Sequence, residues 1–186
     1  MDKQRRFSII INAVLFQLTW FACVIGSANQ LTWPGVLACF CLFLWQWSPQ
    51  RRHPGDGVLV ASAIIFGLII DTFWVQSGLF SFTYNWPIPG MAPAWIIILW
   101  IGFALTINHS LSWLKTHPLL PALMGLIGGP LSYLAGVKFG AMELKADHVL
   151  VCSSLGIVWA IALTLLYLIS LKTSNRNELE SPANVT

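Results

Sequence analysis

Long apolar runs separated by short connections are the feature that most constrains the fold of this chain. Hydrophobic residues make up 56% of its 186 residues, whereas charged residues make up 9%. A water-soluble core does not hide so much apolar surface, whereas a helix that crosses a bilayer needs about 20 apolar residues. The sequence therefore predicts an integral membrane protein and excludes a soluble binding module or a nucleic-acid-binding protein.

The apolar runs predict an all-α fold, a polytopic bundle of about six transmembrane helices. The first run exceeds the apolar region of a secretory signal, so we interpret it as an uncleaved helix. We expect a single transmembrane domain over residues 1–171 and a disordered cytoplasmic tail over residues 172–186, because that tail is polar. The expected helices occupy residues 7–26, 31–48, 58–79, 93–114, 118–140 and 148–171.

Lysine and arginine residues are distributed unevenly between the two ends of these helices. Lys138 and Lys145 fall on one side, and the other eight of the ten fall on the side of the termini. Cytoplasmic connections of membrane proteins carry the excess of positive charge. We therefore expect both termini in the cytoplasm. The eight residues are Lys3, Arg5, Arg6, Arg51, Arg52, Lys115, Lys172 and Arg176.

Asp71 is the only carboxylate placed well inside a long apolar run, Val58–Phe80. A lone acid in hydrocarbon costs roughly 2.5–3.5 kcal/mol on insertion scales, so it normally faces a partner, a cavity or a substrate. Its candidate partners, chosen by depth at about 1.5 Å per residue, are Tyr133, Ser132 and Gln76. None of them carries a positive charge, so burial favours the neutral acid.

A second polar cluster, formed by Asn12, Asn108 and His109, is predicted nearer the cytoplasmic ends of the helices. Asp71 and His109 differ by about eight residues in depth, or roughly 12 Å, whereas a hydrogen bond needs about 3 Å. We therefore expect no dyad between Asp71 and His109, and interpret His109 as an interfacial or helix-packing residue. Asn12 and Asn108 could complete a hydrogen bond between helices.

Two hypotheses for function remain open. In the first, a membrane-embedded enzyme acts on an apolar lipid or isoprenoid, with Asp71 and Tyr133 as catalytic residues that donate or accept a proton. In the second, a non-catalytic small transporter or accessory subunit uses these groups to cross-link helices. If Lys138 folded inward to Asp71, the acid would be ionised and could not act as a proton donor. The residues expected to bind or orient a substrate are Trp74, Gln76, Tyr84 and Ser132.

The fifth apolar run has small residues at every fourth position, Gly128, Ser132, Gly136 and Gly140. Small residues let helices pack closely in lipid, and Pro130 is expected to bend the helix. We expect this face to pack against another helix or to meet a second copy or a partner membrane protein. A groove that passes a substrate is the alternative.

The connection between the third and fourth runs, residues 77–93, contains three prolines and no charged residue. Irregular backbone at membrane depth is tolerated only against protein or a cavity. We therefore expect this segment to lie on or dip into the membrane, as a lid over the Asp71 cluster. A tight turn among the lipid headgroups is the alternative.

The sequence shows no pattern typical of a metal or cofactor site. Cys23, Cys39, Cys41 and Cys152 lie in apolar runs at spacings that match no zinc or haem motif. The chain also lacks a phosphate-binding loop and a His-x-x-x-His pair. We therefore expect no metal and no cofactor, with membrane lipid as the partner and no nucleic acid.

Some of these segments resemble a known family. Asp71 with residues 77–84, 87–95 and 128–136 is similar to a family of small bacterial inner-membrane proteins known only as a domain of unknown function. The resemblance covers residues 7–171 and implies a multi-pass location in the inner membrane, without an established activity. A weaker similarity extends to membrane carotenoid cyclases and hydratases, whose acid is typically Glu; it rests on Asp71, Gly78, Phe82, Tyr84, Pro93 and Trp95.

Overall fold

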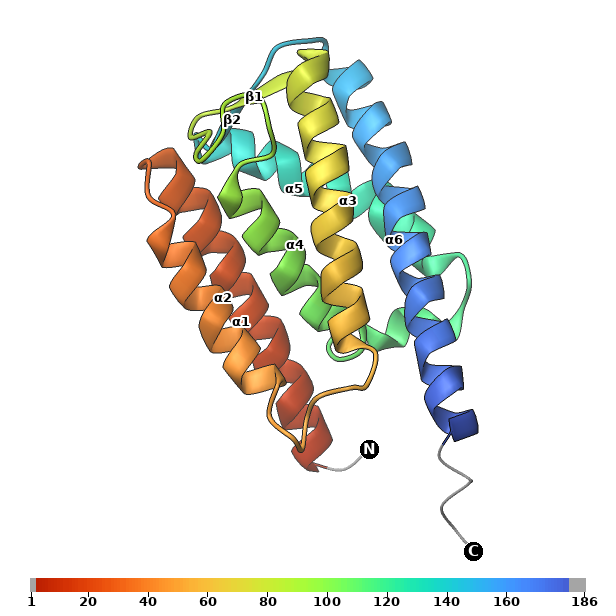
Figure 1. Ribbon diagram of the computed structural model, residues 1–186. Coiled ribbons are helices and arrows are strands. Elements are labelled where there is room, and N and C mark those ends of the chain that lie inside the picture. Colours follow the sequence, from red (N-terminus) through yellow and green to blue (C-terminus); the bar gives the residue numbers. More distant parts are fainter. Residues whose placement is uncertain (1–2, 181–186) are drawn as a thin grey trace, which may run out of the picture.

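The computed structural model describes the backbone of residues 3–180 and the side chains of residues 3–175. Figure 1 shows the α-helices as one bundle, with two short strands at one end. The predicted all-α bundle is confirmed, because each of the six apolar runs forms a helix. The elements are α1 (Lys3–Ala28), α2 (Trp33–Gln46), α3 (Asp56–Ser77), β1 (Phe80–Phe82), α4 (Ala94–Ile107), the 3-10 helix η1 (Ser112–Thr116), α5 (Leu120–Lys138), β2 (Met142–Leu144) and α6 (His148–Glu180).

The helix α4 lies at the centre of the bundle. It packs against α1, α2 and α3, and it also touches α6. Its side chains are apolar on all sides, and Trp95, Trp100, Leu105 and Ile107 are each at most 2% exposed. A helix that is hydrophobic all round is expected to be enclosed by other elements, so the sequence of α4 accounts for its central position.

Four of the helices, α1, α3, α5 and α6, are long and apolar enough to cross a membrane. The helices α2 and α4 have 14 residues each, or about 21 Å, which is shorter than a hydrocarbon core of about 30 Å. The structure thus has four candidate spans, compatible with a membrane protein, rather than six full-length ones. The helix α4 ends at Ile107 instead of residue 114, because Asn108 and His109 turn into a polar network.

The helix α6 continues beyond the end that its apolar run predicts. Residues 172–180 are helical, where the sequence predicted a disordered tail from residue 172; the rest of that tail, residues 181–186, lies outside the described residues. The side chain of Thr173 bonds the carbonyl of Ile169, and that of Ser174 bonds the carbonyl of Ser170. Thr173 also packs against Gly55, where a Cβ would lie 2.4 Å from its hydroxyl oxygen. The helix thus continues past the apolar segment and contacts the residue before α3.

The strands β1 and β2 form an antiparallel pair that the sequence did not predict. Phe80 pairs with Leu144 and Phe82 with Met142, and the Thr83 N–H donates to the Ala141 carbonyl at 2.9 Å. The pair joins the α3–α4 connection to the α5–α6 connection at one end of the bundle (Figure 1). Strands of three residues carry too little alternation to be recognised without their partner.

Glycines on α5 and α6 allow these two helices to pack closely. A Cβ at Gly125 would lie 2.3 Å from the carbonyl oxygen of Trp159, and one at Gly156 would lie 2.8 Å from that of Leu126. Both obstacles are backbone atoms, which cannot rotate away as a side chain can. The small residues of the fifth run therefore serve helix packing, as predicted, but through Gly125 rather than through the face that contains Gly128.

Replacing Gly125 with Ala should destabilise the bundle, because its Cβ would collide with the α6 backbone. We expect a loss of about 1–3 kcal/mol, the usual effect of overpacking, seen as a lower midpoint of thermal unfolding in mild detergent. Gly128→Ala is the matched control on the same helix, since a Cβ there meets no atom within 4 Å. Equal midpoints for the two variants would contradict this packing.

Candidate functional site

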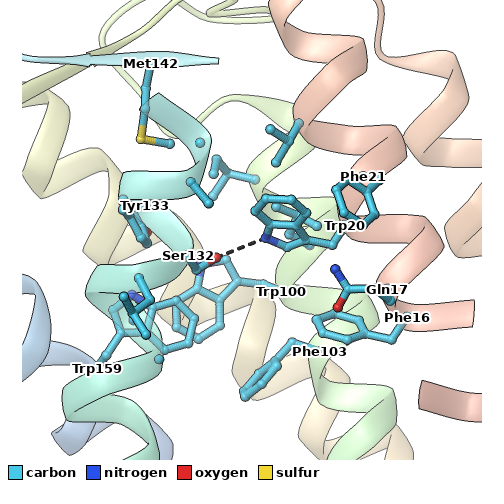
Figure 2. Close-up of a pocket in the computed structure, with 18 of the residues that line it drawn as sticks. Phe16, Gln17, Trp20, Phe21, Trp100, Phe103, Ser132, Tyr133, Met142 and Trp159 are labelled. Carbon is cyan, nitrogen blue, oxygen red and sulfur yellow. Dashed lines mark hydrogen bonds between the residues drawn. The ribbon is translucent and has the colours of Figure 1, made fainter. Parts of the chain in front are cut away.

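A cavity of about 500 Å³ lies between α1, α4 and α5 (Figure 2). Its wall is mostly apolar, and aromatic side chains from four helices contribute to it, among them Trp20 of α1, Trp100 of α4, Tyr133 of α5 and Trp159 of α6. Exposed apolar residues, including Phe21 and Phe139, lie at its rim. Its size is within the range of about 300–1,000 Å³ that small-molecule sites occupy. The cavity therefore opens toward the apolar surface of the bundle and suits an apolar ligand.

The small-residue face of α5 is divided between the cavity and a turn. Gly128 and Ser132 line the cavity, and a Cβ at Gly128 would meet open space. Gly136 also lines it, with Met142 3.1 Å from the position of a Cβ. Gly140 lies beyond the end of α5 and has a positive φ of 79°, so it belongs to a turn. Part of this face thus lines a cavity instead of packing against a helix; that a substrate passes along it stays a prediction.

Asp71 is completely buried on α3 and receives two hydrogen bonds. The Tyr133 hydroxyl donates to Oδ1 at 2.5 Å, and the Trp100 indole N–H donates to Oδ2 at 2.7 Å. Both donors line the cavity, whereas Asp71 does not. The acid therefore lies behind the wall, and Tyr133 and Trp100 stand between it and the cavity.

Trp100 is held in place by Gly67 and Trp159. A Cβ at Gly67, one helical turn before Asp71, would lie 2.3 Å from Cδ1 of Trp100. On its other side the indole of Trp100 stacks on that of Trp159, with ring centroids 4.5 Å apart and an interplanar angle of 8°. Sequence reasoning noted Trp100 as a deep tryptophan but missed its role. The sequence did contain a clue: the indole N–H of a buried tryptophan needs an acceptor, and Trp100 is predicted at a depth close to that of Asp71.

The first part of the predicted lid covers Tyr133. Phe80 of β1 is 1% exposed, and its ring meets the Tyr133 ring with centroids 5.5 Å apart. Farther along, Trp86 and Ile88 are more than half exposed, and the Ala92 N–H donates to the Thr72 hydroxyl at 3.0 Å. The segment thus folds back onto α3 and also presents apolar side chains outward.

Ser132 lies at the cavity wall but does not contact Asp71. Its hydroxyl oxygen accepts the indole N–H of Trp20 at 3.0 Å (Figure 2), which joins α5 to α1. The rings of Trp20 and Phe21 also contact Phe139 edge-on. Ser132 is therefore a bridging residue between the two sides of the cavity, and its predicted pairing with Asp71 is wrong.

The other predicted substrate-binding residues lie away from the cavity. Gln76 is exposed, because five residues along a helix turn a side chain about 140° from the direction of Asp71. Tyr84 is half-buried, and its backbone carbonyl accepts the indole N–H of Trp95 at 3.2 Å. Trp74 is 2% exposed and packs against Phe80 in the core. None of Gln76, Tyr84 and Trp74 lines the cavity described here.

Lys138 does not fold inward to Asp71. It is an exposed residue at the end of α5, and the carboxylate oxygens of Asp71 accept from Tyr133 and Trp100 instead. Among the described residues, no group of three or more His, Cys, Asp or Glu side chains could hold a metal ion.

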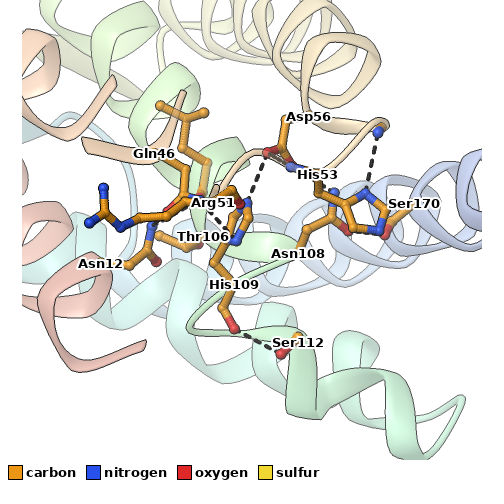
Figure 3. A network of polar contacts seen from close by, with 12 residues as sticks. Asn12, Gln46, Arg51, His53, Asp56, Thr106, Asn108, His109, Ser112 and Ser170 are labelled. Carbon is orange, nitrogen blue, oxygen red and sulfur yellow. Dashed lines mark hydrogen bonds and ion pairs between the residues drawn. The ribbon is translucent and has the colours of Figure 1, made fainter. Parts of the chain in front are cut away.

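A polar network joins the helices where α3 begins and α4 ends (Figure 3). The Asn12 amide donates to Gln46 at 2.8 Å, and the Gln46 amide lies 3.0 Å from Nδ1 of His109. Nε2 of His109 lies 2.9 Å from Asp56 Oδ2, and Asn108 donates to Oδ1 at 2.8 Å. Because the Gln46 amide nitrogen is a donor, Nδ1 of His109 accepts and Nε2 carries the hydrogen.

The predicted cluster of Asn12, Asn108 and His109 is present, with different partners from those expected. Asn12 accepts from the Ser110 hydroxyl at 2.6 Å and does not pair with Asn108. His109 pairs with Asp56, so the expectation that it would not pair with Asp71 is confirmed. Asp56 was missed because it precedes the predicted start of the third helix at residue 58. An acid at the start of an apolar run was the available signal.

Two basic groups beside this network have shifted pKa values. Partial burial lowers the pKa of His53, and the nearby Asp56 carboxylate opposes that shift. Burial also lowers the pKa of Lys115, again against the effect of Asp56. The Lys115 ammonium donates to Asn108 Oδ1 at 2.8 Å, and the Ser170 hydroxyl donates to the same oxygen at 2.6 Å. The network therefore extends from α1 to α6.

Replacing Tyr133 with Phe should destabilise the protein by about 1–3 kcal/mol, because Oδ1 of the buried Asp71 would lose its donor. The measurement is the midpoint of thermal unfolding of the purified protein in mild detergent. Tyr84→Phe is the matched control, since its hydroxyl makes no hydrogen bond within the part of the chain that the structure describes. A Tyr133→Phe midpoint equal to that of the control would show that the contact contributes nothing.

Comparisons with known proteins place the chain in a family. No curated protein and no solved structure matches it, and the weaker similarity to carotenoid cyclases and hydratases is not shown. A family model described as "Protein of unknown function (DUF2878)" matches residues 9–165, which is well over half of the chain. The resemblance to a family of unknown function is thus confirmed, and the chain belongs to the DUF2878 family.

Proposed function

We propose that this chain is a multi-pass protein of the bacterial inner membrane that binds an apolar lipid or isoprenoid between α1, α4 and α5. The observation that carries the proposal is the aromatic, glycine-lined cavity of about 500 Å³. Its rim is formed by exposed apolar side chains, including those of Phe21, Met124 and Phe139. An opening of this composition favours a ligand that enters from the bilayer. An apolar ligand is stable in apolar surroundings, and its transfer from lipid into the cavity removes no polar group from water.

The polar groups in the wall suit a ligand with one small uncharged polar group. Tyr133, Ser132 and Gln17 all line the cavity, and none of them is charged. Since the Ser132 oxygen accepts from Trp20, its hydroxyl hydrogen is available to a ligand oxygen. A hydroxyl or carbonyl at the end of an apolar chain matches these groups better than a charged head does.

With Asp71 ionised, where the sequence predicted a neutral acid, the Tyr133–Asp71 pair gives the cavity an acceptor for one proton. The hydrogen bonds that Tyr133 and Trp100 donate to the two carboxylate oxygens support the ionised form. In the proposed step a substrate O–H or C–H bond breaks, its electron pair stays on the substrate, and its proton binds the Tyr133 oxygen. The original hydroxyl proton of Tyr133 passes to Asp71 in the same step. The direction of the Tyr133–Asp71 hydrogen bond supports this order. Tyr133 is then the catalytic residue, and Asp71 acts through it.

A partner helix is the second candidate for the occupant of the cavity. The open space beside Gly128 would also admit a side chain from a second copy or from another membrane protein, as small residues do at helix interfaces. In that case the protein is a non-catalytic subunit. Purification in mild detergent distinguishes the two candidates, because one gives bound lipid and the other a specific complex.

Replacing Gly128 with Leu should fill the cavity and remove most of the lipid that co-purifies with the protein. The measurement is mass spectrometry of lipids extracted from the purified protein, at equal protein amounts. Ile127→Phe is the control on the neighbouring position, because Ile127 is 59% exposed and does not line the cavity. Undiminished lipid in Gly128→Leu, or a protein complex that this variant alone loses, would overturn lipid binding at this site.

Replacing Asp71 with Asn should lower turnover by about 10²-fold or more, the effect of losing general acid–base catalysis. The measurement compares membrane lipid profiles of cells that lack the protein and are complemented with wild type or variant. Asp147→Asn, in the exposed α5–α6 connection, is the matched control. A profile for inserted Asp71→Asn identical to wild type would refute the chemical step and leave binding as the function.

A further inference from the structure

A second cavity, of about 620 Å³, lies beside the Asp56–His109 network. Its lining is about half polar, whereas that of the first cavity is mostly apolar, and it includes Ser8 from α1, Gln50 from the α2–α3 connection and Ser112 from η1. Arg5 and Arg51 also line it. These residues come from segments far apart in the sequence, which the fold brings around one space.

The charges around this cavity favour an anion. Arg5 makes no hydrogen bond or ion pair with the described residues, so its charge faces no acid in that part of the chain. The nearby acid, Asp56, is 1% exposed, and its oxygens accept from His109, Asn108 and the His53 N–H. The acid is thus satisfied inside the protein, whereas the two arginines are available to a ligand.

Arg51 is held in position before any ligand binds. Its guanidinium carbon lies 3.8 Å from the centre of the Trp45 ring, and Nη1 donates to the Ser48 hydroxyl at 3.0 Å. Figure 3 shows this guanidinium directed away from Asp56. A planar guanidinium stacked on an aromatic ring keeps its remaining N–H groups for an anion, and such groups match the geometry of phosphate oxygens.

We propose that Arg5 and Arg51 bind a phosphate group in this second cavity, with the hydroxyl of Ser8 as a further donor; the Ser112 hydroxyl already donates to the His109 carbonyl at 2.8 Å. The phosphate belongs to a lipid headgroup or to a free phosphate compound, which present the same oxygens. Basic residues near a membrane surface attract anionic lipids in general. In this protein, Arg5 and Arg51 line the same cavity, whereas their sequence neighbours Arg6 and Arg52 do not.

The test uses the full-length protein in mild detergent, with two probes applied separately. Phosphatidylglycerol is titrated against phosphatidylcholine and the retained lipid is counted by native mass spectrometry; inorganic phosphate is titrated and the thermal midpoint is followed. We expect retention of phosphatidylglycerol over phosphatidylcholine, or a phosphate-dependent rise of the midpoint. The first result identifies a lipid headgroup as the source and the second a free phosphate.

Variants make the result specific to the cavity. Arg5→Gln and Arg51→Gln should each weaken binding of the responding probe by about tenfold, the effect of one charge-assisted hydrogen bond. Arg6→Gln and Arg52→Gln remove the same charge from exposed positions outside the cavity and should bind like wild type. Arg5→Gln is the cleaner of the two lining variants, because Arg51 also holds the loop through Trp45 and Ser48.

Equal losses in all four variants would overturn the proposal in favour of a general charge effect. A protein that responds to neither probe would overturn it as well. Neither outcome bears on the first cavity, since Gly128→Leu and Asp71→Asn test that site with different ligands and lie on α5 and α3.

Discussion

The burial of one carboxyl group organises the centre of this protein. Asp71 accepts from Trp100 of α4 and from Tyr133 of α5, so a single side chain on α3 fixes the positions of two other helices. An acid in apolar surroundings is costly unless its oxygens are satisfied, and here two neutral donors take the place of a cation. Trp159 of α6 stacks on Trp100 and so belongs to the same unit. The cavity wall is a consequence of this arrangement.

The middle and the C-terminal end of α4 lie in different surroundings. Trp100, in its middle, belongs to an apolar region in which one acid is shared by aromatic donors. Beyond its last turn, His109 and Asn108 enter a network of charged and amide groups around Asp56. Both regions satisfy the oxygens of a buried carboxylate. The donors to Asp71 carry no formal positive charge, whereas Asp56 lies beside the imidazole of His109 and near the ammonium group of Lys115. This asymmetry gives the bundle an apolar cavity in one region and a polar cavity in the other.

Depth could be predicted from the sequence, whereas direction around each helix could not. Counting along the helices correctly paired Asp71 with Tyr133 and separated it from His109. The same count included Gln76, which faces away, and Ser132, which bonds Trp20 instead. Trp100 was missed because its partner depends on which faces of the helices meet, and Asp56 was missed because it precedes the predicted start of the third helix. The β1–β2 pair was missed because Phe80–Phe82 acquires its role only opposite Met142–Leu144, a contact that no local pattern contains.

The bridge between Trp20 and Ser132 has a kinetic consequence. These residues connect α1 to α5 across the cavity, so under the proposed lipid binding a molecule that entered between these two helices would first require that hydrogen bond to open. The residence time of the ligand would then depend on how often α1 and α5 separate rather than on the strength of the ligand's own contacts. Exchange would also take place without passage through water, so even a compound with negligible aqueous solubility could equilibrate with the site.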